Sequence, residues 1–277
     1  MSERQNRPIG IFDSGVGGMT VLRALLRQLP AEEFSFLGDT ARLPYGTKGK
    51  NTITEYTLHA ARRLVEHHAV KMLVVACNTA SSVALPALRA QFPDIPVVGV
   101  IDPGARAAVR VSPKGRIAVL ATEATVRGGA YVEAIHRLNP DAQVVSRACT
   151  LFVALAEEGW LEGVVVEGVV RRYLADIFAA QVKPDTLLLG CTHFPLLQKA
   201  IAHVVGSDVH IVDSAQTTAE AVSALLKETG LARTTPALPA ERAVHFMATD
   251  NVSRFAATGA LFLGRKLSEE DVELVDI

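Results

Sequence analysis

The chain has 277 residues, of which 49% are hydrophobic and 21% charged, a balance that is ordinary for a globular protein with a sizeable core. Its formal net charge is -1, so no strong field favours DNA, RNA or an anionic membrane as a partner. Residues 1–8 lack the apolar stretch of a secretory signal, and no uncharged apolar run approaches the roughly 18 residues of a membrane span. We therefore expect a cytoplasmic protein.

Short apolar runs alternate with longer segments of helical periodicity along the whole chain. The predicted strands are 9–12, 34–37, 72–76, 97–100, 117–121, 142–146, 187–190, 209–212 and 243–247. The predicted helices cover 21–29, 53–68, 79–91, a segment after Gly104, 131–138, 164–180, 217–229 and 252–263. This alternation predicts an α/β fold with mainly parallel sheets and helices on both faces. Residues 112–115 are a predicted turn and candidate domain crossing, and residues 236–239 a predicted surface loop.

The two halves of the chain resemble each other. An apolar strand ends at Cys77 in the first half and another at Cys191 in the second, and in each case a helix and a strand ending in aspartate follow, at Asp102 and Asp213. We interpret this as two pseudosymmetric units, although any two βαβ segments share some likeness. In open parallel sheets ligands bind beyond the carboxyl ends of the strands, which makes these four residues and Asp13 candidate site residues.

Polar side chains surround both cysteines. Cys77 is followed by Asn78 and Thr79, and Cys191 by Thr192. A thiol between a strand and a helix N-terminus favours the thiolate, and the flanking groups suit the carboxylate of an α-amino acid. The alternative is that each cysteine is simply a buried core residue.

The third cysteine, Cys149, has no polar helix start after it, and we interpret it as structural. The three cysteines contain no C-x-x-C pair, and the histidines form no cluster with metal-ligand spacing. The sequence therefore predicts neither a disulfide framework nor a metal site. His193 lies two residues from Cys191 and is a candidate proton partner for that thiol.

Two polar loops follow the first two predicted strands. Residues 13–18 form a glycine-rich turn that could hold a phosphate or a carboxylate, but it is no G-x-G-x-x-G motif and lacks the lysine of a P-loop. Asp13 would repel a phosphate, but it could hold an ammonium group or tune a nearby thiol. In residues 39–46, the Tyr45 hydroxyl and the Gly46 amide could bind a distal carboxylate, unless this is only a surface turn.

Four segments, 13–18, 39–46, 76–80 and 190–193, resemble those of the bacterial glutamate racemases in sequence and in order. The resemblance covers residues 9 to about 262. It implies two pseudosymmetric α/β domains with the active site in the cleft between them. One domain would comprise residues 1–100 and 211–277 and the other residues 101–210. It also implies a cytoplasmic homodimer that supplies D-glutamate for peptidoglycan synthesis and cell shape.

The resemblance also implies roles for individual residues. The catalytic set would be Cys77, Cys191, Asp13, His193 and Glu157. The substrate-binding set would be Asp13, Ser14, Tyr45, Gly46, Asn78, Thr79, Thr192 and His193. The chain departs from the family at Thr150, where proline is common, and at Gly128, where serine is common.

Racemisation removes the α-proton from one face of the amino acid and delivers a proton to the other. One thiolate and one thiol on opposite sides accomplish this without a cofactor and without turning the substrate. Asp13 would assist Cys77, and His193 would assist Cys191. The resemblance implies that Cys77 abstracts from the D-enantiomer and Cys191 from the L-enantiomer.

Four alternatives remain open at this stage. An aspartate or broad-specificity racemase would share the architecture. A one-cysteine decarboxylase or isomerase would use a single thiol. A non-catalytic protein could bind a partner through the same fold, and a thiol redox sensor would need a resolving partner for Cys77 or Cys191.

Overall fold

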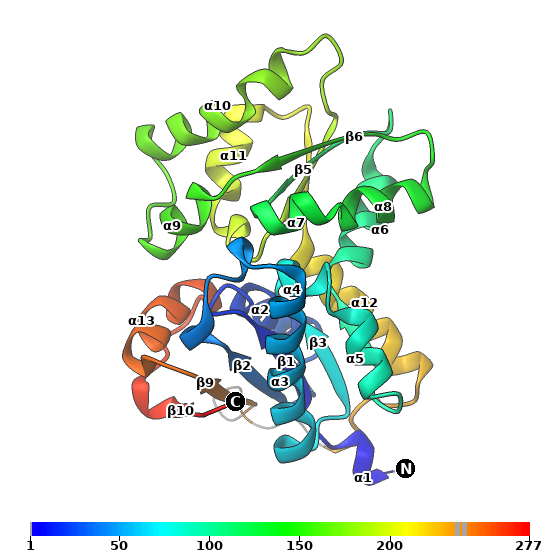
Figure 1. Ribbon diagram of the computed structural model, residues 1–277, viewed down its shortest axis with the longest axis vertical. Helices are drawn as coiled ribbons and strands as arrows, with labels where there is room; N and C mark the ends of the chain where they lie inside the picture. Colours follow the sequence, from blue (N-terminus) through cyan, green and yellow to red (C-terminus); the bar gives the residue numbers. More distant parts are fainter. Residues whose placement is uncertain (1, 236–238, 240–242) are drawn as a thin grey trace.

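The computed structural model describes residues 2–235, 239 and 243–277, and these form two lobes, each built on a parallel sheet (Figure 1). The larger lobe has six strands in the order β10-β9-β2-β1-β3-β4, and the smaller lobe has four in the order β6-β5-β7-β8. All pairings are parallel. The strands are β1 (Ile9–Asp13), β2 (Phe34–Gly38), β3 (Met72–Val75), β4 (Val97–Gly99), β5 (Arg116–Ala121), β6 (Gln143–Ala148), β7 (Thr186–Gly190), β8 (His210–Asp213), β9 (Val244–Ala248) and β10 (Val272–Leu274). The predicted fold class, α/β with parallel sheets in two units, is confirmed.

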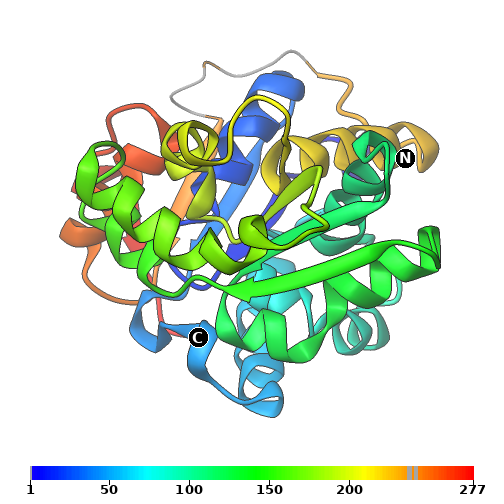
Figure 2. The same cartoon turned by 90° about the horizontal axis from the view of Figure 1, so that it is seen from above.

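Helices cover both faces of each sheet, as the view from above shows for the smaller lobe (Figure 2). The α-helices are α1 (Ser2–Gln5), α2 (Met19–Gln28), α3 (Lys50–His68), α4 (Asn78–Ser81), α5 (Leu85–Gln91), α6 (Ile101–Val111), α7 (Glu123–Gly128), α8 (Ala130–Leu138), α9 (Leu151–Glu157), α10 (Val164–Ala179), α11 (Gln198–Val205), α12 (Ser214–Glu228) and α13 (Val252–Leu263). Short 3-10 helices are η1 (Thr40–Arg42), η2 (Tyr45–Thr47), η3 (Phe194–Leu197) and η4 (Glu269–Asp271). In the described part of the chain, no helix combines the length and the apolar character needed to span a membrane.

The strands are apolar along their length because each sheet has a core on both faces. In β3, Met72 and Val74 join one cluster of buried residues, whereas Leu73 and Val75 join the cluster on the opposite face. In β5 of the smaller lobe, Ala118 and Leu120 face one core and Ile117 and Val119 the other. Burial on both faces is what a continuous apolar run predicts in a parallel sheet.

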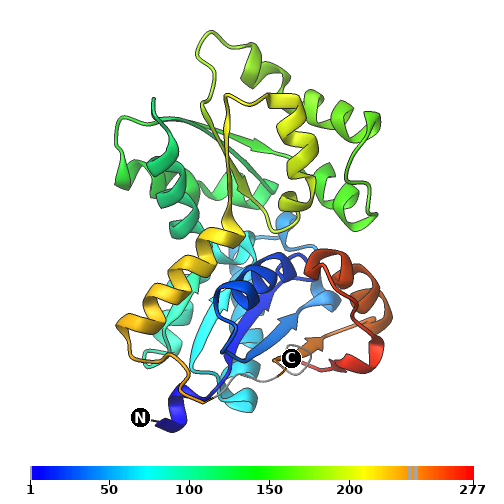
Figure 3. The ribbon, with the colours of Figure 1, turned by 180° about the vertical axis from the view of Figure 1, so that it is seen from behind.

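The internal likeness of the two halves is also present in the strand order. The order β2-β1-β3-β4 in the larger lobe repeats as β6-β5-β7-β8 in the smaller one. Strand β3 is therefore equivalent to β7, and Cys77 and Cys191 follow these two equivalent strands. The chain passes into the smaller lobe through α6 and returns through α12, which Figure 3 shows running from the smaller lobe down along the larger one.

The single helix predicted over residues 79–91 is wrong, because two helices occupy this segment. Helix α4 ends at Ser81, and α5 begins at Leu85 with Pro86 in its first turn. Proline has no backbone N–H, and its ring clashes with the preceding turn, so one helix cannot continue through this position. The sequence patterns did not indicate the short elements α1, α7, α9 and β10.

Two expectations about organisation are not tested by these observations. The surface loop predicted at 236–239 lies outside the described residues, apart from Pro239. The division of the chain into domains of residues 1–100 with 211–277 and of residues 101–210 stays a prediction.

Candidate active site

A cavity of about 350 Å³ lies where the two lobes meet. Its walls come from the segments that follow the carboxyl ends of strands in both sheets, as expected for parallel α/β proteins. From the larger lobe the lining residues are Ser14, Gly15, Leu43, Pro44, Tyr45, Gly46, Thr47, Cys77, Asn78 and Thr79. From the smaller lobe they are Thr122, Glu123, Thr150, Val153, Ala154, Glu157, Cys191, Thr192 and His193. Both candidate thiols thus reach one cavity from opposite lobes.

The Cys77 thiol lies at the start of α4 on the larger-lobe side. Its sulfur accepts a hydrogen bond from the Ala80 amide at 3.4 Å and lies 3.4 Å from the Ser14 hydroxyl, on the loop after β1. Burial and the neighbouring Asp13 carboxylate raise the pKa of Cys77 to about 12. The expectation that a helix N-terminus favours the thiolate here is therefore wrong for Cys77, because burial and a like charge outweigh the contribution of one short helical turn.

Asp13 lies beneath the cavity and does not line it. The side chain is fully buried at the end of β1, where one oxygen accepts the Gly15 amide at 3.0 Å. The other oxygen, Oδ1, is buried with no hydrogen-bond partner. Burial raises the pKa of Asp13, while the amides of Gly18, Gly15 and Ser14 and the charge of His193 oppose that rise.

The glycines after β1 allow neighbouring side chains, some of them from the other lobe, to pack closely against this turn. A Cβ atom on Gly17 would lie 2.3 Å from Oγ1 of Thr192 and 2.5 Å from Nδ1 of His193. A Cβ atom on Gly18 would lie 2.6 Å from Cβ of Asp13. The glycine-rich turn thus makes room for side chains of the site.

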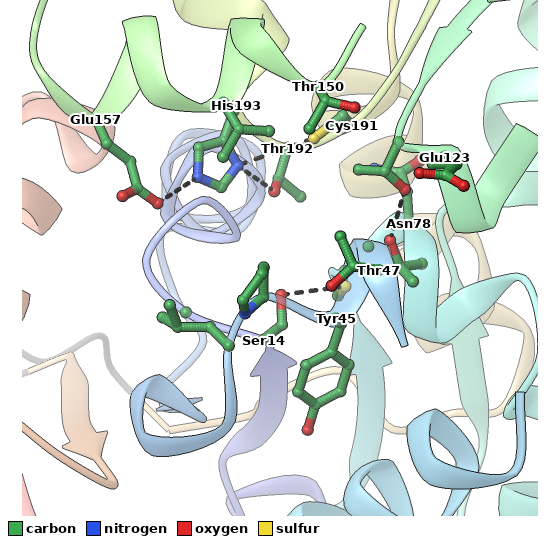
Figure 4. Close-up of a pocket in the computed structure, with 18 of the residues that line it drawn as sticks. Ser14, Tyr45, Thr47, Asn78, Glu123, Thr150, Glu157, Cys191, Thr192 and His193 are labelled. Atoms are coloured by element: carbon green, nitrogen blue, oxygen red, sulfur yellow. Dashed lines mark hydrogen bonds and ion pairs between the residues drawn. The ribbon is translucent and has the colours of Figure 1, made fainter. Parts of the chain in front are cut away.

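The Tyr45 hydroxyl has a different partner from the expected one. It donates a 2.6 Å hydrogen bond to the buried Asp39 carboxylate, and Figure 4 shows the ring directed away from His193 and Thr192. Burial and the Asp39 charge raise the pKa of Tyr45. The hydroxyl that we expected to bind a distal carboxylate thus contacts Asp39 in this structure. The loop still lines the cavity through Tyr45 and Gly46, after the cis peptide bond between Leu43 and Pro44.

A buried histidine connects the second thiol to an acid (Figure 4). Nδ1 of His193 lies 3.9 Å from the Cys191 sulfur, and Nε2 lies 3.1 Å from Oε1 of Glu157 on α9. Burial alone would lower the pKa of His193, but its contacts with Cys191 and Glu157 raise it to about 10. The hydrogen bond from His193, against the effect of burial, lowers the pKa of Glu157. An imidazolium therefore lies next to the Cys191 sulfur, which is the environment that stabilises a thiolate.

Hydroxyl and amide groups bridge the lobes beside the thiols. The hydroxyls of Thr79 and Thr122 lie 2.9 Å apart, and Thr125 lies 3.0 Å from Thr122. The carboxamide oxygen of Asn78 accepts a 2.6 Å hydrogen bond from Tyr131, while its Nδ2 is buried without a partner. An unpaired buried donor on the cavity wall is suited to an anionic ligand.

Of the catalytic and substrate-binding residues that the family resemblance implies, all except Asp13 line the cavity. The other strand-end aspartates do not: Asp213 caps α12, and Asp102 pairs with Arg137 at 2.9 Å on the surface. Cys149 is fully buried, consistent with a structural role, and burial raises its pKa to about 12. The sequence reading assigned no role to Thr47, Glu123 or Thr150. Applying the strand-end rule to β5 and β6 would have pointed to Glu123 and Thr150.

Comparison with known proteins places this geometry in a family. The family model described as Asp/Glu/Hydantoin racemase matches residues 9–222. The chain is 49% identical over 263 residues to the glutamate racemase of Geobacter metallireducens, covering 95% of each chain. It is similar to the crystal structure of a glutamate racemase isoform from Bacillus anthracis, with a TM-score of 0.90 and 36% identity over 99% of this chain and 98% of that one.

A second structural relative is the glutamate racemase of Francisella tularensis, which was solved in complex with D-glutamate. Its TM-score is 0.88 at 36% identity, with 98% of each chain covered. The likeness extends over both lobes. The chain therefore belongs to the Asp/Glu/Hydantoin racemase family.

Proposed function

We propose that the chain is a glutamate racemase that interconverts L- and D-glutamate without a cofactor, using Cys77 and Cys191 as its acid and base. The observation that carries the proposal is the placement of the two thiols. They follow equivalent strands, β3 and β7, and line one cavity from opposite lobes. A substrate held between them would present its α-carbon to a sulfur on each face, as inversion by two bases requires. The relatives named above support glutamate as the substrate.

The surroundings of the thiols support a division of roles in the free enzyme. Cys77 carries its proton, because its pKa is raised to about 12. Cys191 lies 3.9 Å from Nδ1 of His193, which would serve as its proton partner. The enzyme would deprotonate the L-enantiomer with Cys191 and protonate the opposite face with Cys77. In the reverse reaction the two cysteines exchange roles: Cys77 deprotonates the D-enantiomer, and Cys191 protonates the opposite face.

Two groups of donors would hold the substrate. Nδ2 of Asn78 and the hydroxyls of Thr79 and Thr192 would bind the α-carboxylate, and they would stabilise the charge that develops on it as the α-proton leaves. The backbone amides at the start of η2, including that of Gly46, would bind the distal carboxylate, because the first amides of a helix lack partners within it. Ser14 would hold the Cys77 thiol in place.

The role of Asp13 is indirect in this scheme. It lies under Cys77 and outside the cavity, and its charge acts on both Cys77 and His193. We propose that Asp13 positions and tunes Cys77, whereas His193 and Glu157 do the same for Cys191.

The product D-glutamate would supply peptidoglycan synthesis in the cytoplasm and would thereby contribute to cell shape. We retain a homodimer and the two domains, residues 1–100 with 211–277 and residues 101–210, as parts of the proposal.

The test is circular dichroism of purified protein with L-glutamate and no added cofactor. The signal should decay to zero for the wild type, and Cys77→Ser and Cys191→Ser should each slow the decay at least about a hundredfold. Cys149→Ser is the matched control and should retain activity. No decay with folded wild-type protein contradicts the assignment, and full activity in either active-site variant contradicts the two-base mechanism.

Deuterium transfer sharpens the mechanistic part. In D₂O, a two-base enzyme delivers a solvent-derived deuteron from its second thiol, so D-glutamate formed early from L-glutamate should be deuterated at the α-carbon. A one-base isomerase would return part of the original proton to the product. Proton retention in early product, measured by NMR or mass spectrometry, contradicts two bases.

An aspartate or broad-specificity racemase is the nearest competing function. Comparing kcat/KM for L-glutamate and L-aspartate separates these functions, and we expect glutamate to be preferred.

A redox sensor is a second competing function, and it would need Cys77 and Cys191 to form a reversible disulfide. All three cysteines are free thiols in this structure.

A further inference from the structure

Outside the active site, three side chains with metal-binding atoms converge on one edge of the larger lobe. They are His68 at the end of α3, His245 on β9 and Glu273 on β10. One ligand atom from each residue lies within 4.8 Å of the other two. Sequence spacing could not reveal this group, because its members come from three separate elements. We propose that His68, His245 and Glu273 bind a divalent transition-metal ion such as Zn²⁺.

The backbone brings two of these side chains to the same face of the sheet. β9 and β10 are parallel neighbours in which Glu273 is level with Met247, two residues after His245. Side chains alternate along a strand, so His245, Met247 and Glu273 point the same way. Nε2 of His245 lies 2.7 Å from Oε2 of Glu273. α3 packs over this face and brings in His68, whose ring centroid lies 5.0 Å from that of His245.

One ring nitrogen of His68 lacks a partner, which also indicates a ligand at this position. Its Nε2 is buried and has no hydrogen-bond partner. An unpaired buried ring nitrogen costs free energy unless something binds to it. A metal ion would provide that partner.

The donor set determines the kind of ion. Two imidazoles and one carboxylate suit Zn²⁺ and similar transition metals, which leave a position for water in three-ligand sites, whereas Mg²⁺ and Ca²⁺ prefer oxygen donors. Arg63 lies 3.4 Å from Oε1 of Glu273, so Oε2, which contacts Nε2 of His245, is the oxygen that would turn to the metal. His245 and Glu273 are exposed, so their side chains can close the remaining distance. A bound ion would join the end of α3 to β9 and β10, near the C-terminus.

Titration calorimetry of Zn²⁺ into metal-stripped protein tests the proposal. Active-site thiols also bind zinc, so the titration uses the full chain carrying Cys77→Ser and Cys191→Ser. We expect one Zn²⁺ per chain, and we expect His245→Ala and Glu273→Gln each to weaken binding at least about tenfold. His67→Ala, on the exposed neighbour of His68, is the matched control and should bind as before. Both test substitutions are at exposed positions, and circular dichroism checks that each variant is folded.

Two further readouts complete the test. Zn²⁺ should raise Tm in a concentration-dependent manner in the protein carrying the two serine substitutions and in its His67→Ala variant, but not in its His245→Ala variant. Co²⁺ in the same protein should absorb in the visible without a sulfur-to-metal charge-transfer band. Absence of binding in the protein with the two serine substitutions, or unchanged binding in both His245→Ala and Glu273→Gln, overturns the proposal.

Discussion

Nε2 of His193 lies 3.1 Å from the carboxylate of Glu157, so an acid on α9 contributes, with Cys191, to the raised pKa of this ring. Glu157 itself also lies 3.6 Å from Arg254, at its other oxygen. The acid thus acts through the histidine, and its contribution can be removed without touching either thiol.

We expect Glu157→Gln to lower kcat for L-glutamate at least about tenfold while KM changes little, because the substituted amide stabilises the imidazolium less well. The alkaline limb of the pH–rate profile should also move to lower pH, since the contact with Glu157 raises the pKa of His193. Steady-state rates across pH measure both effects. Glu158→Gln, on the exposed neighbouring residue, is the control. An unchanged alkaline limb would show that Glu157 does not tune His193.

Protein stability should depend on His193 over a defined pH range. The pKa of this ring rises from 6.5 in the unfolded chain to about 10 in the fold, so its charge stabilises the folded state fully below pH 6.5. This contribution should be lost as pH rises through about 10. The Tm difference between wild type and His193→Gln should therefore be larger at pH 6 than at alkaline pH. A constant difference across this range, measured by calorimetry, would contradict the raised pKa.

Gly17 tests how closely the lobes must approach. In Gly17→Ala the new Cβ would lie 2.3 Å from Oγ1 of Thr192, so Thr192 and His193 must shift. We expect a loss of about 1–3 kcal/mol in the free energy of unfolding and a strong fall in kcat. Denaturant unfolding and racemisation rates measure the two effects.

Gly168→Ala is the matched control for that substitution. No atom lies within 4 Å of a Cβ at Gly168, which is in the middle of α10. Alanine has the higher helix propensity, so this variant should be stabilised by up to about 1 kcal/mol with unchanged activity. If both glycine variants behave alike, close approach of the lobes at Gly17 is not required.

The Tyr45 hydroxyl should matter for stability and not for substrate binding. Tyr45→Phe removes the 2.6 Å hydrogen bond to Asp39, whose carboxylate is buried. We expect a loss of about 1–3 kcal/mol in the free energy of unfolding, because a buried acceptor loses a donor. KM for glutamate should change by less than about threefold. A large rise in KM with unchanged stability would instead place the hydroxyl on the substrate. Tyr56→Phe, on the adjacent ring, is the control.

The fold class and most of the site could be predicted from the sequence because they depend on local patterns. Continuous apolar runs predicted buried parallel strands, and the strand-end positions of Cys77 and Cys191 predicted that both would reach a ligand site. Helix ends were harder to predict. The break between α4 and α5 depends on Pro86, whose effect the helical periodicity of the neighbouring residues concealed.

Only the tertiary structure decided which partner each polar group has. The sequence alone determined that two thiols follow equivalent strands. It could not determine that burial and Asp13 raise the pKa of Cys77, that Asp39 takes the Tyr45 hydroxyl, or that Glu157 reaches His193. These outcomes depend on which polar groups meet in the interior, and so on distances between segments far apart in the chain, which local sequence patterns do not determine.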